Sequence, residues 1–263
     1  MNNIIGVRRE DKSRWERRVP LIPSHVRELK KDFGMRFVVQ PSPVRVFADD
    51  DFRLEGAKVQ EDLGPCRVIM AVKEIPEGLI EADKAYVFFS HTIKGQLANM
   101  PMLRRLIDLK CTLIDYERIV DDRGRRLVFF GRQAGEAGMV DTLWALGRRL
   151  RHEGIANPFE ALEPMHSYRS LVEAKEVIAE IGAGIRRDGL PESLVPLIAG
   201  FTGYGHVSQG APAMFDLLPS DEVEPEEFPS FVGRGEFSPN RVYKSVVFEQ
   251  HLVRPADPAR TSD

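Results

Sequence analysis

The stretch VIMAVKEIPEGLIEADKAYVFFSHTIK, residues 68–94, decides the fold. It contains two apolar runs of strand length, VIMAV and AYVFFS, and each ends in a group that can transfer protons, Lys73 or His91. If the two strands are neighbours in a parallel sheet, both side chains leave it at the rim where ligands bind in open α/β sheets. The pattern therefore suggests an acid/base pair. Solvated side chains, marking the return of each strand to water, are the alternative.

The composition indicates a globular protein, since 43% of the 263 residues are hydrophobic and 29% are charged. This length allows two modest domains. A formal net charge of -3 argues against a general nucleic-acid binder, which needs a basic face. The two cysteines, Cys66 and Cys111, lie beside apolar residues without metal-ligand spacing, which predicts reduced thiols. With no membrane-length apolar run, we expect a soluble, cytoplasmic protein without a membrane partner.

Strands and helices alternate in the first half of the sequence. Ser24 is the expected N-cap of a helix that Gly34 ends. The expected strands are 3–7, 36–40, 68–72, 85–90, 111–116 and 127–130, with helices near 24–33, 49–55 and 95–110. This alternation predicts a largely parallel, Rossmann-like sheet covered on both faces. Arg17 and Arg18 lie in a basic loop after the first strand; they are either solvated or offer a fork for a carboxylate.

The second half predicts the start of a dinucleotide-binding domain. An apolar strand at 195–201 meets a turn with Gly203 and Gly205, and a helix follows with Gly210 near its start. Such glycines let the backbone approach a pyrophosphate at the helix N-terminus. A second strand ends at Glu224, where an acidic residue would meet the adenosine ribose.

Three segments follow from these patterns. We predict a substrate and catalytic domain at 1–132, linker helices at 133–190, and the start of an NAD(P)-binding Rossmann domain at 191–263. A complete domain of that class needs about five or six parallel strands. The sequence after Gly200 supplies the first strand–helix unit, a second strand and little else, so the cofactor domain is expected to be incomplete.

Six motifs carry a family resemblance: WERRVPLIP, AVKEIPE, FFSHTIKGQ, LIDYE, GRRLVFFG and FTGYGHVSQGA. In this order they are similar to the lysine-ketoglutarate reductase domain of aminoadipic semialdehyde synthases and to the lysine-forming saccharopine dehydrogenases. The resemblance covers roughly residues 4–252. A lysine and a histidine at these two strand ends are also shared with the wider alanine dehydrogenase and transhydrogenase superfamily.

The resemblance implies a reductive condensation. The ε-amine of lysine adds to the carbonyl of 2-oxoglutarate, water leaves to form an imine, and a hydride from NADP or NAD reduces it to saccharopine. It also implies roles for particular residues. Lys73 and His91 would be the acid/base groups, Arg18 and Arg126 would hold substrate carboxylates, Glu74 and Glu117 would face cationic amino groups, Phe130 would line the pocket, and Lys94 would support His91 or the cofactor side.

Three hypotheses stay open at this point. The first is a reductase of the saccharopine branch that works as part of a longer or two-chain enzyme. The second is a binding module for an amino acid or keto acid without catalysis, and the third is another amino-acid dehydrogenase of the superfamily. Because a partial sheet exposes its edges, a homo-oligomer or a complementing chain is expected. The sequence does not decide between NADH and NADPH.

Overall fold

A computed structural model describes residues 3–253 and 256. Within it the chain forms two compact units, Met1–Phe129 (unit 1) and Phe130–Asp263 (unit 2). The division falls three residues before the predicted end of the substrate domain at residue 132. Each unit contains its own parallel sheet, as expected for an α/β protein.

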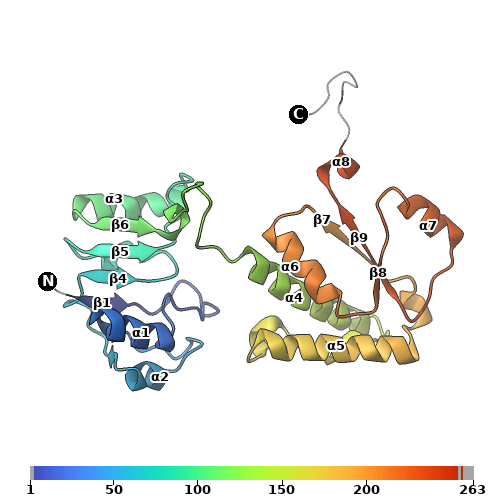
Figure 1. The fold of residues 1–263 in the computed structure, drawn as a ribbon, viewed down its shortest axis with the longest axis horizontal. Coiled ribbons are helices and arrows are strands. Elements are labelled where there is room, and N and C mark those ends of the chain that lie inside the picture. Colours follow the sequence, from blue (N-terminus) through green and yellow to red (C-terminus); the bar gives the residue numbers. More distant parts are fainter. Residues whose placement is uncertain (1–2, 254–255, 257–263) are drawn as a thin grey trace. The chain divides into compact units, whose positions relative to one another are not determined.

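Unit 1 is built on a six-stranded sheet in which every neighbouring pair is parallel. The strand order is β3-β2-β1-β4-β5-β6 (Figure 1). The strands are β1 (Ile4–Val7), β2 (Arg36–Val39), β3 (Lys58–Val59), β4 (Val68–Met70), β5 (Ala85–Phe88) and β6 (Thr112–Asp115). This is the doubly wound order, whose ligand crevice lies beyond the carboxyl ends of the strands. The predicted Rossmann-like sheet is confirmed.

Helices cover both faces of this sheet, because successive residues of a strand point to opposite sides. On one face, α1 (Pro23–Phe33) and α2 (Asp49–Leu54) pack on Phe37 and Val39 of β2. On the other face, α3 (Met100–Asp108) packs in the cluster that contains Val38. Three short 3-10 turns complete the unit: η1 (Glu77–Leu79), η2 (Leu97–Asn99) and η3 (Tyr116–Arg118).

Two local predictions in unit 1 are wrong. The N-cap of α1 is Ile22, with Pro23 at the first helical position, because proline needs no N–H partner there; Gly34 ends the helix as predicted, with φ +63°. The segment 127–130 is not a strand. The turn before this segment brings it back to Ile119, whose carbonyl accepts a hydrogen bond from the Leu127 N–H. The segment therefore does not pair with the free edge of β6.

Unit 2 contains a three-stranded parallel sheet that packs against helices, two of which are long. Its helices are α4 (Gly131–His152), α5 (Leu171–Asp188), α6 (His206–Phe215), α7 (Phe228–Arg234) and α8 (Glu249–Leu252). The strands are β7 (Ile198–Thr202), β8 (Ser220–Glu222) and β9 (Val242–Val247). Three 3-10 turns lie between them, η4 (Pro158–Ala161), η5 (Met165–Ser167) and η6 (Glu192–Leu194). Ser170 caps α5 by accepting the N–H of Glu173.

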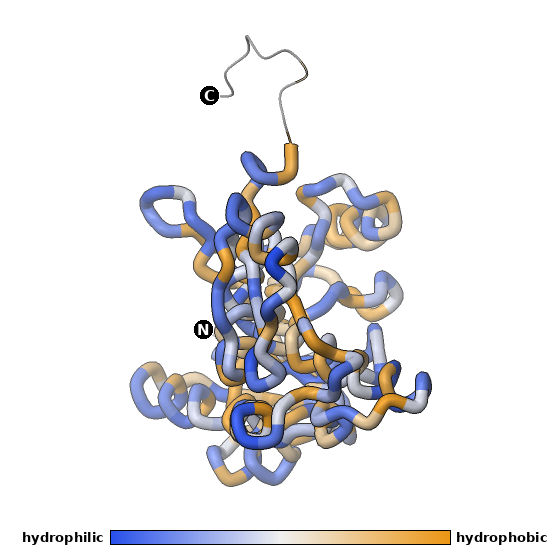
Figure 2. Tube along the Cα trace, turned by 90° about the vertical axis from the view of Figure 1, so that its right-hand side faces the viewer, coloured by the Kyte–Doolittle hydropathy of each residue, from blue (hydrophilic) through white to orange (hydrophobic). Residues whose placement is uncertain are grey.

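The segment predicted as linker helices, 133–190, belongs to the core of unit 2 instead. Val140 of α4 and Ile178 of α5 are fully buried in one cluster with Phe201 and Met214. Hydrophobic and hydrophilic residues alternate along the tube in Figure 2, and the buried residues of α5, Ala174, Ile178, Ile181 and Ile185, recur at the spacing of an amphipathic helix that lies on a core. The helices therefore belong to the folded unit and do not form a spacer.

The strand order of unit 2 is β7-β9-β8, so β9 lies between the two strands that precede it in the sequence. The sequence pattern identifies strands but not their neighbours. The late strand β9 takes the central place, with Val242, Tyr243, Lys244 and Ser245 buried.

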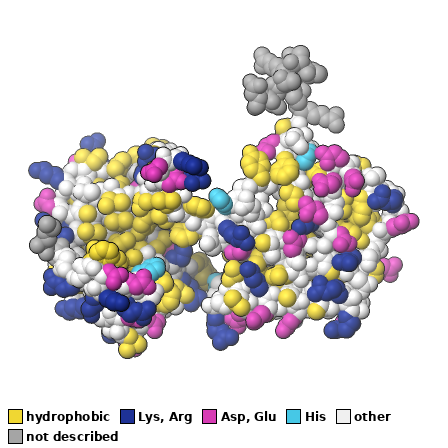
Figure 3. All heavy atoms as spheres, viewed as in Figure 1, with side chains coloured by type: hydrophobic (Ala, Val, Ile, Leu, Met, Phe, Trp, Pro, Cys, Tyr) yellow, Lys and Arg dark blue, Asp and Glu magenta, His cyan; other side chains and the backbone are white. Residues whose placement is uncertain are grey.

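Surface properties agree with the composition. On the face shown in Figure 3, basic and acidic side chains are interspersed over the surface. None of the helices in the described part of the chain has the length and apolar character needed to cross a membrane.

Candidate functional site

Lys73 and His91 leave neighbouring strands at the same rim of the sheet of unit 1. Met70 of β4 pairs with Val87 of β5, and the ladder continues past both strands, with the Phe89 N–H donating to the Val72 carbonyl at 3.1 Å. Lys73 directly follows Val72, and His91 lies two residues after Phe89. The rim geometry expected from the sequence is thus present.

His91 is held in one orientation by its backbone and by Glu74. The residue has φ +53°. This left-handed backbone conformation costs free energy for any residue other than glycine, and it persists where the surrounding structure holds it. Its Nδ1 lies 2.7 Å from Glu74 Oε1. An ionised carboxylate only accepts, so Nδ1 carries the proton and donates it. Nε2 is then the ring nitrogen on the side away from Glu74.

Glu74 stays ionised because cations and donors surround it. Burial would raise the pKa of Glu74, but hydrogen bonds from Lys12, from its own backbone and from His91 outweigh it and lower the pKa to about 2. Lys12 Nζ lies 2.6 Å from Oε2, and Asn99 Nδ2 donates to Oε1 at 3.3 Å. A cavity of about 480 Å³ adjoins this group and is lined by Lys12, Glu74, Asn99, Pro76 and Met102, among others.

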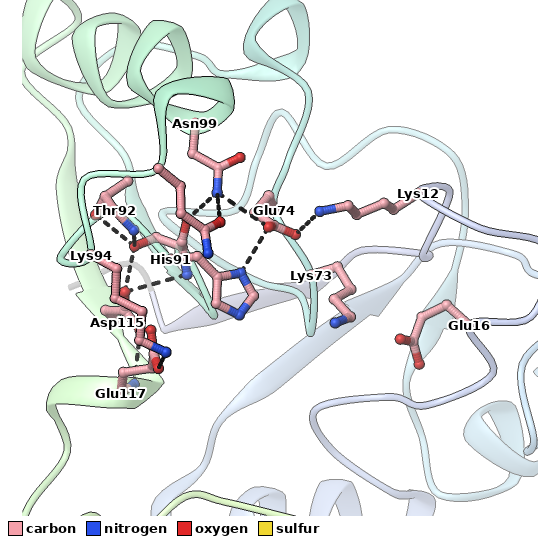
Figure 4. Close-up of polar contacts among 12 residues, drawn as sticks. Lys12, Glu16, Lys73, Glu74, His91, Thr92, Lys94, Asn99, Asp115 and Glu117 are labelled. Atoms are coloured by element: carbon pink, nitrogen blue, oxygen red, sulfur yellow. Dashed lines mark hydrogen bonds and ion pairs between the residues drawn. The ribbon is translucent and has the colours of Figure 1, made fainter. Parts of the chain in front are cut away.

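The backbone that carries Lys73 is fixed by a buried carboxylate. Glu10, which follows β1, accepts the N–H of Val72 at 2.6 Å and the N–H of Lys73 at 3.0 Å. Burial raises the pKa of Glu10, and these two backbone donors partly offset the rise. The Lys73 side chain extends between His91 and Glu16 (Figure 4), and its charge acts on the Glu16 carboxylate.

Glu117 forms the third charged group of the rim. It lies at the end of β6, and its Oε1 is 3.2 Å from Lys94 Nζ and 3.1 Å from Arg126 Nη1. Its other oxygen, Oε2, is buried and has no hydrogen-bond partner among the described residues. Asp115 accepts the Glu117 N–H at 2.8 Å and binds Ser90, so the ends of β5 and β6 are tied together. A buried acceptor oxygen without a partner suits a cationic ligand.

The predicted substrate-binding charges already have partners within the chain. Arg18 makes a two-point contact with Glu16, at 2.8 Å from Nε and 2.6 Å from Nη2, and this outweighs burial to lower the pKa of Glu16. Arg126 pairs with Glu117. Lys94 also pairs with Glu117, and Glu74 makes the contact to His91. Support of the cofactor side by Lys94 stays a prediction. Phe130 precedes α4 in unit 2, and its role stays a prediction.

The glycine turn of unit 2 fits an anionic group at two of its three glycines. Gly203 has φ +84°, which favours glycine, and Gly205 is the N-cap of α6, where an added Cβ would meet nothing within 4 Å. The first turn of a helix directs N–H groups outward, as a pyrophosphate requires.

Gly210 and Glu224 do not fit that expectation. A Cβ on Gly210 would lie 2.2 Å from the Arg132 carbonyl oxygen, so this glycine permits the close packing of α6 on α4. Glu224 follows β8, which β9 separates from β7, so it lies one strand too far away. The strand end beside the turn belongs to β9, because the Gly203 N–H donates to the Val247 carbonyl at 2.9 Å.

Sequence reasoning missed four residues that shape the rim: Glu10, Lys12, Glu16 and Asn99. The first three lie in the loop RREDKSRWERR, for which only the role of Arg17 and Arg18 was predicted. A signal was present, since acidic residues inside a basic loop indicate internal ion pairs. Asn99 carried no such signal.

Comparison with known proteins supports the same family of folds. Residues 6–137 match the family model described as "Alanine dehydrogenase/PNT, N-terminal domain". A solved L-alanine dehydrogenase superposes with a TM-score of 0.54 at 18% identity, covering 93% of this chain and 60% of that one. At this identity the likeness concerns the fold alone.

Two curated relatives are closer in sequence. The alpha-aminoadipic semialdehyde synthase of Arabidopsis thaliana is 39% identical over 100% of this chain and 26% of its own length. A saccharopine dehydrogenase of Neurospora crassa, described as NAD(+), L-lysine-forming, is 31% identical over 76% of this chain and 54% of its own. The chain thus spans about a quarter of the first relative and about half of the second.

Proposed function

Because the chain belongs to the alanine dehydrogenase/PNT N-terminal domain family, we propose that it acts as a lysine-ketoglutarate reductase-like oxidoreductase. The reaction is the reductive condensation of lysine with 2-oxoglutarate to saccharopine, carried out as part of a longer or two-chain enzyme. One observation carries the proposal: Lys73 and a His91 oriented by Glu74 meet at one rim of a doubly wound sheet. Such a pair supports proton transfer.

The proton transfers fall to two groups of this chain. His91 Nε2 takes a proton from the lysine ammonium, and the freed amine nitrogen attacks the carbonyl carbon of 2-oxoglutarate. Lys73 gives a proton to the carbonyl oxygen, which becomes a hydroxyl, and takes a proton back from the adduct nitrogen. His91 then returns its proton to the hydroxyl, which leaves as water as the protonated imine forms. Glu74 holds the His91 ring in place through its contact with Nδ1, and the Glu74 carboxylate remains ionised at neutral pH.

The charged groups of the rim suit substrates that carry both signs. Glu117 has an unpartnered buried oxygen, which supports its role in holding an amino group. Arg18 and Arg126 would bind substrate carboxylates by sharing or exchanging their present partners, Glu16 and Glu117. A guanidinium fork binds a carboxylate at two points, which gives direction as well as attraction.

A nicotinamide cofactor, NADP or NAD, would supply the hydride that reduces the imine. The turn at Gly203 and Gly205 would hold its pyrophosphate. The ribose would lie near the end of β9 instead of Glu224, since β9 is the neighbour of β7. Free thiols at Cys66 and Cys111 support a reducing, cytoplasm-like compartment.

A specific observation also favours the second hypothesis. Glu117 Oε2 is buried without a partner among the described residues, and this suits binding of a cationic group whether or not a reaction follows. A module that binds amino acids or keto acids without turnover would have the same unit 1 site. Another dehydrogenase of the superfamily would differ in substrate, and competition between lysine and alanine separates it from a saccharopine former.

Calorimetric titration with NADPH and NADH, alone and then with lysine plus 2-oxoglutarate, tests the proposal. Lysine-dependent oxidation, followed by absorbance of the reduced nicotinamide, is the expected result. Lys73→Met and His91→Ala should abolish turnover and leave cofactor affinity unchanged. Lys58→Met and His25→Ala, on the exposed surface of unit 1, are the matched controls. Retention of 2-oxoglutarate without cofactor binding would instead identify the binding module.

A further inference from the structure

Asn99 lies at the N-cap of α3 but does not cap the helix. Its side chain makes no hydrogen bond to the N–H groups of the first helical turn. Asparagine is among the residues preferred at an N-cap, because its side-chain oxygen can accept one of these N–H groups. The Asn99 amide group instead points toward Glu74 and the loop that carries His91 (Figure 4). This side chain is therefore used for contacts outside its own helix.

The amide nitrogen of Asn99 lies near three acceptor oxygens. Its Nδ2 is 3.1 Å from the Ser90 carbonyl oxygen, 3.3 Å from Glu74 Oε1 and 3.4 Å from Gln96 Oε1. Carbonyl and carboxylate oxygens only accept, so the amide must turn its nitrogen, which carries two N–H donors, toward them. The two shorter contacts, to Ser90 and Glu74, are enough to use both donors.

These two contacts hold His91 at both of its ends. The Ser90 carbonyl belongs to the peptide group that joins Ser90 to His91, and this peptide group lies on one side of the torsion φ of His91. Glu74 Oε1 lies 2.7 Å from Nδ1 of the imidazole, at the other end of the residue. One amide therefore fixes the backbone of His91 and, through Glu74, its ring. A non-glycine residue at φ +53° needs such support from its surroundings.

Asp115 holds Ser90 from the side of the sheet. Ser90 is fully buried, and its N–H donates to Asp115 Oδ2 at 3.3 Å. The Ser90 hydroxyl donates to the same oxygen. These contacts act on the part of Ser90 that precedes its carbonyl group. Asp115 thus fixes where the loop leaves β5, and Asn99 fixes the direction in which the loop continues to His91.

We propose that Asn99 is a positioning residue for the acid/base group His91. It bonds the Ser90 carbonyl and Glu74 at once, and so sets the orientation of the imidazole. Asn99 acts through His91 and takes no part in proton transfer itself, because its two N–H donors are bound within the chain. The consequence for turnover rests on the proposed function, in which His91 Nε2 takes a proton from the substrate. The orientation of the ring does not depend on it.

Two substitutions separate positioning from helix capping. Asn99→Asp keeps an oxygen that can cap α3 and adds a negative charge that favours a helix N-terminus. It removes both N–H donors, however, and places a second carboxylate beside Glu74. Asn99→Ala removes the polar group altogether. A residue that served only the helix would tolerate aspartate, whereas a residue that positions His91 tolerates neither change.

Nitrogen NMR of the whole chain with ¹⁵N-labelled histidine tests the orientation without any need for turnover. Long-range couplings show which ring nitrogen carries the proton, and the signals lost in His91→Ala identify His91. The neutral ring of the wild type should carry its proton on Nδ1. The share of this tautomer should fall by about half or more in Asn99→Asp and in Asn99→Ala. Asn157→Ala is the matched control, because Asn157 Nδ2 also bonds two carbonyl oxygens, at 3.1 and 3.2 Å, but in unit 2.

The nicotinamide absorbance assay adds a kinetic readout. In both Asn99 variants kcat should fall by about tenfold or more, while KM for lysine and for 2-oxoglutarate stays within about twofold of the wild type. This split is expected of a residue that orients a proton-transfer group and does not bind substrate. A wild-type chain without turnover would contradict the proposed function, and the NMR result would still decide the role of Asn99.

Two results would overturn the proposal. An unchanged His91 tautomer in both variants would show that Glu74 orients the ring without Asn99. Wild-type behaviour of Asn99→Asp, with a loss only in Asn99→Ala, would assign Asn99 to the helix. Circular dichroism identifies a variant that has lost its fold, and Asn99→Gln then serves in its place. Glutamine keeps both donors on a longer side chain and should restore most of the Nδ1–H tautomer; less recovery with glutamine than with aspartate would also refute the positioning role.

Discussion

Replacement of Glu74 by glutamine tests whether ion pairing at the rim stabilises unit 1. The carboxylate is bound by Lys12 and His91, and its pKa falls from 4.5 to about 2. A shift of that size corresponds to about 3 kcal/mol, at about 1.4 kcal/mol per pKa unit. Lys12 is half exposed, so solvent screens part of this interaction. We therefore expect Glu74→Gln to lower the free energy of unfolding by about 2 kcal/mol at pH 7.

The pH dependence gives the sign of the effect. The folded pKa lies below the unfolded one, so the stabilisation is fully present above pH 4.5 and is lost as the pH falls through 2. Less than half of the difference between the wild type and Glu74→Gln should remain at about pH 3. Glutamine has no carboxylate to protonate, and the stability of the variant should change less over this range.

Urea unfolding at pH 7, 5, 4 and 3 is the assay, because urea does not screen charge. Hydrogen exchange of the peptides that contain β4 and β5 reports unit 1 separately, since two units can unfold apart. Glu61→Gln is the control: Glu61 pairs with Arg9 at 2.7 Å but is 63% exposed, and such pairs contribute about 0–1 kcal/mol. Equal losses at pH 7 and pH 3, or equal losses in both variants, would refute the reasoning.

Three further predictions concern single side chains. Gly210→Ala should destabilise unit 2 by about 1–3 kcal/mol in thermal melts, because the new Cβ meets the Arg132 carbonyl. The control Gly138→Ala has open space and should be neutral or stabilising. Equal melting temperatures of the two variants would contradict this. Glu10→Gln should speed hydrogen exchange of the peptide containing Val72 and Lys73, since one acceptor oxygen becomes a donor, and unchanged exchange would contradict the role of this carboxylate. Tyr116→Phe should change the free energy of unfolding by no more than about 0.5 kcal/mol, or raise it. The buried hydroxyl has no hydrogen-bond partner in the described structure, and burial raises the pKa of Tyr116. A loss above about 1 kcal/mol would argue for an unseen partner.

Local patterns predicted much of unit 1. Apolar runs predicted five of the six strands of the sheet and missed β3, which is two residues long. The order of the motifs predicted the family. The rim position of Lys73 and His91 followed from the same runs, because parallel strands end at a common edge. The extra strand predicted at 127–130 failed for a related reason. An apolar run shows β propensity, but pairing needs a free neighbour, and the turn after Ile119 prevents it.

The sequence by itself determined five of the six strands of unit 1, that their sheet is parallel, and which two groups end neighbouring strands. These properties depend on periodicity and on short-range chain geometry, which a linear sequence contains. Only the tertiary structure decided that Glu74, and not Lys94, orients His91, that Glu10 holds the backbone of Lys73, and that β9 separates β7 from β8. Each of these contacts joins residues far apart in the chain. Which of several possible contacts forms depends on the distance between the side chains and on their burial. These two quantities set the strength of a charge pair, and burial also decides which strand takes the central place in a sheet.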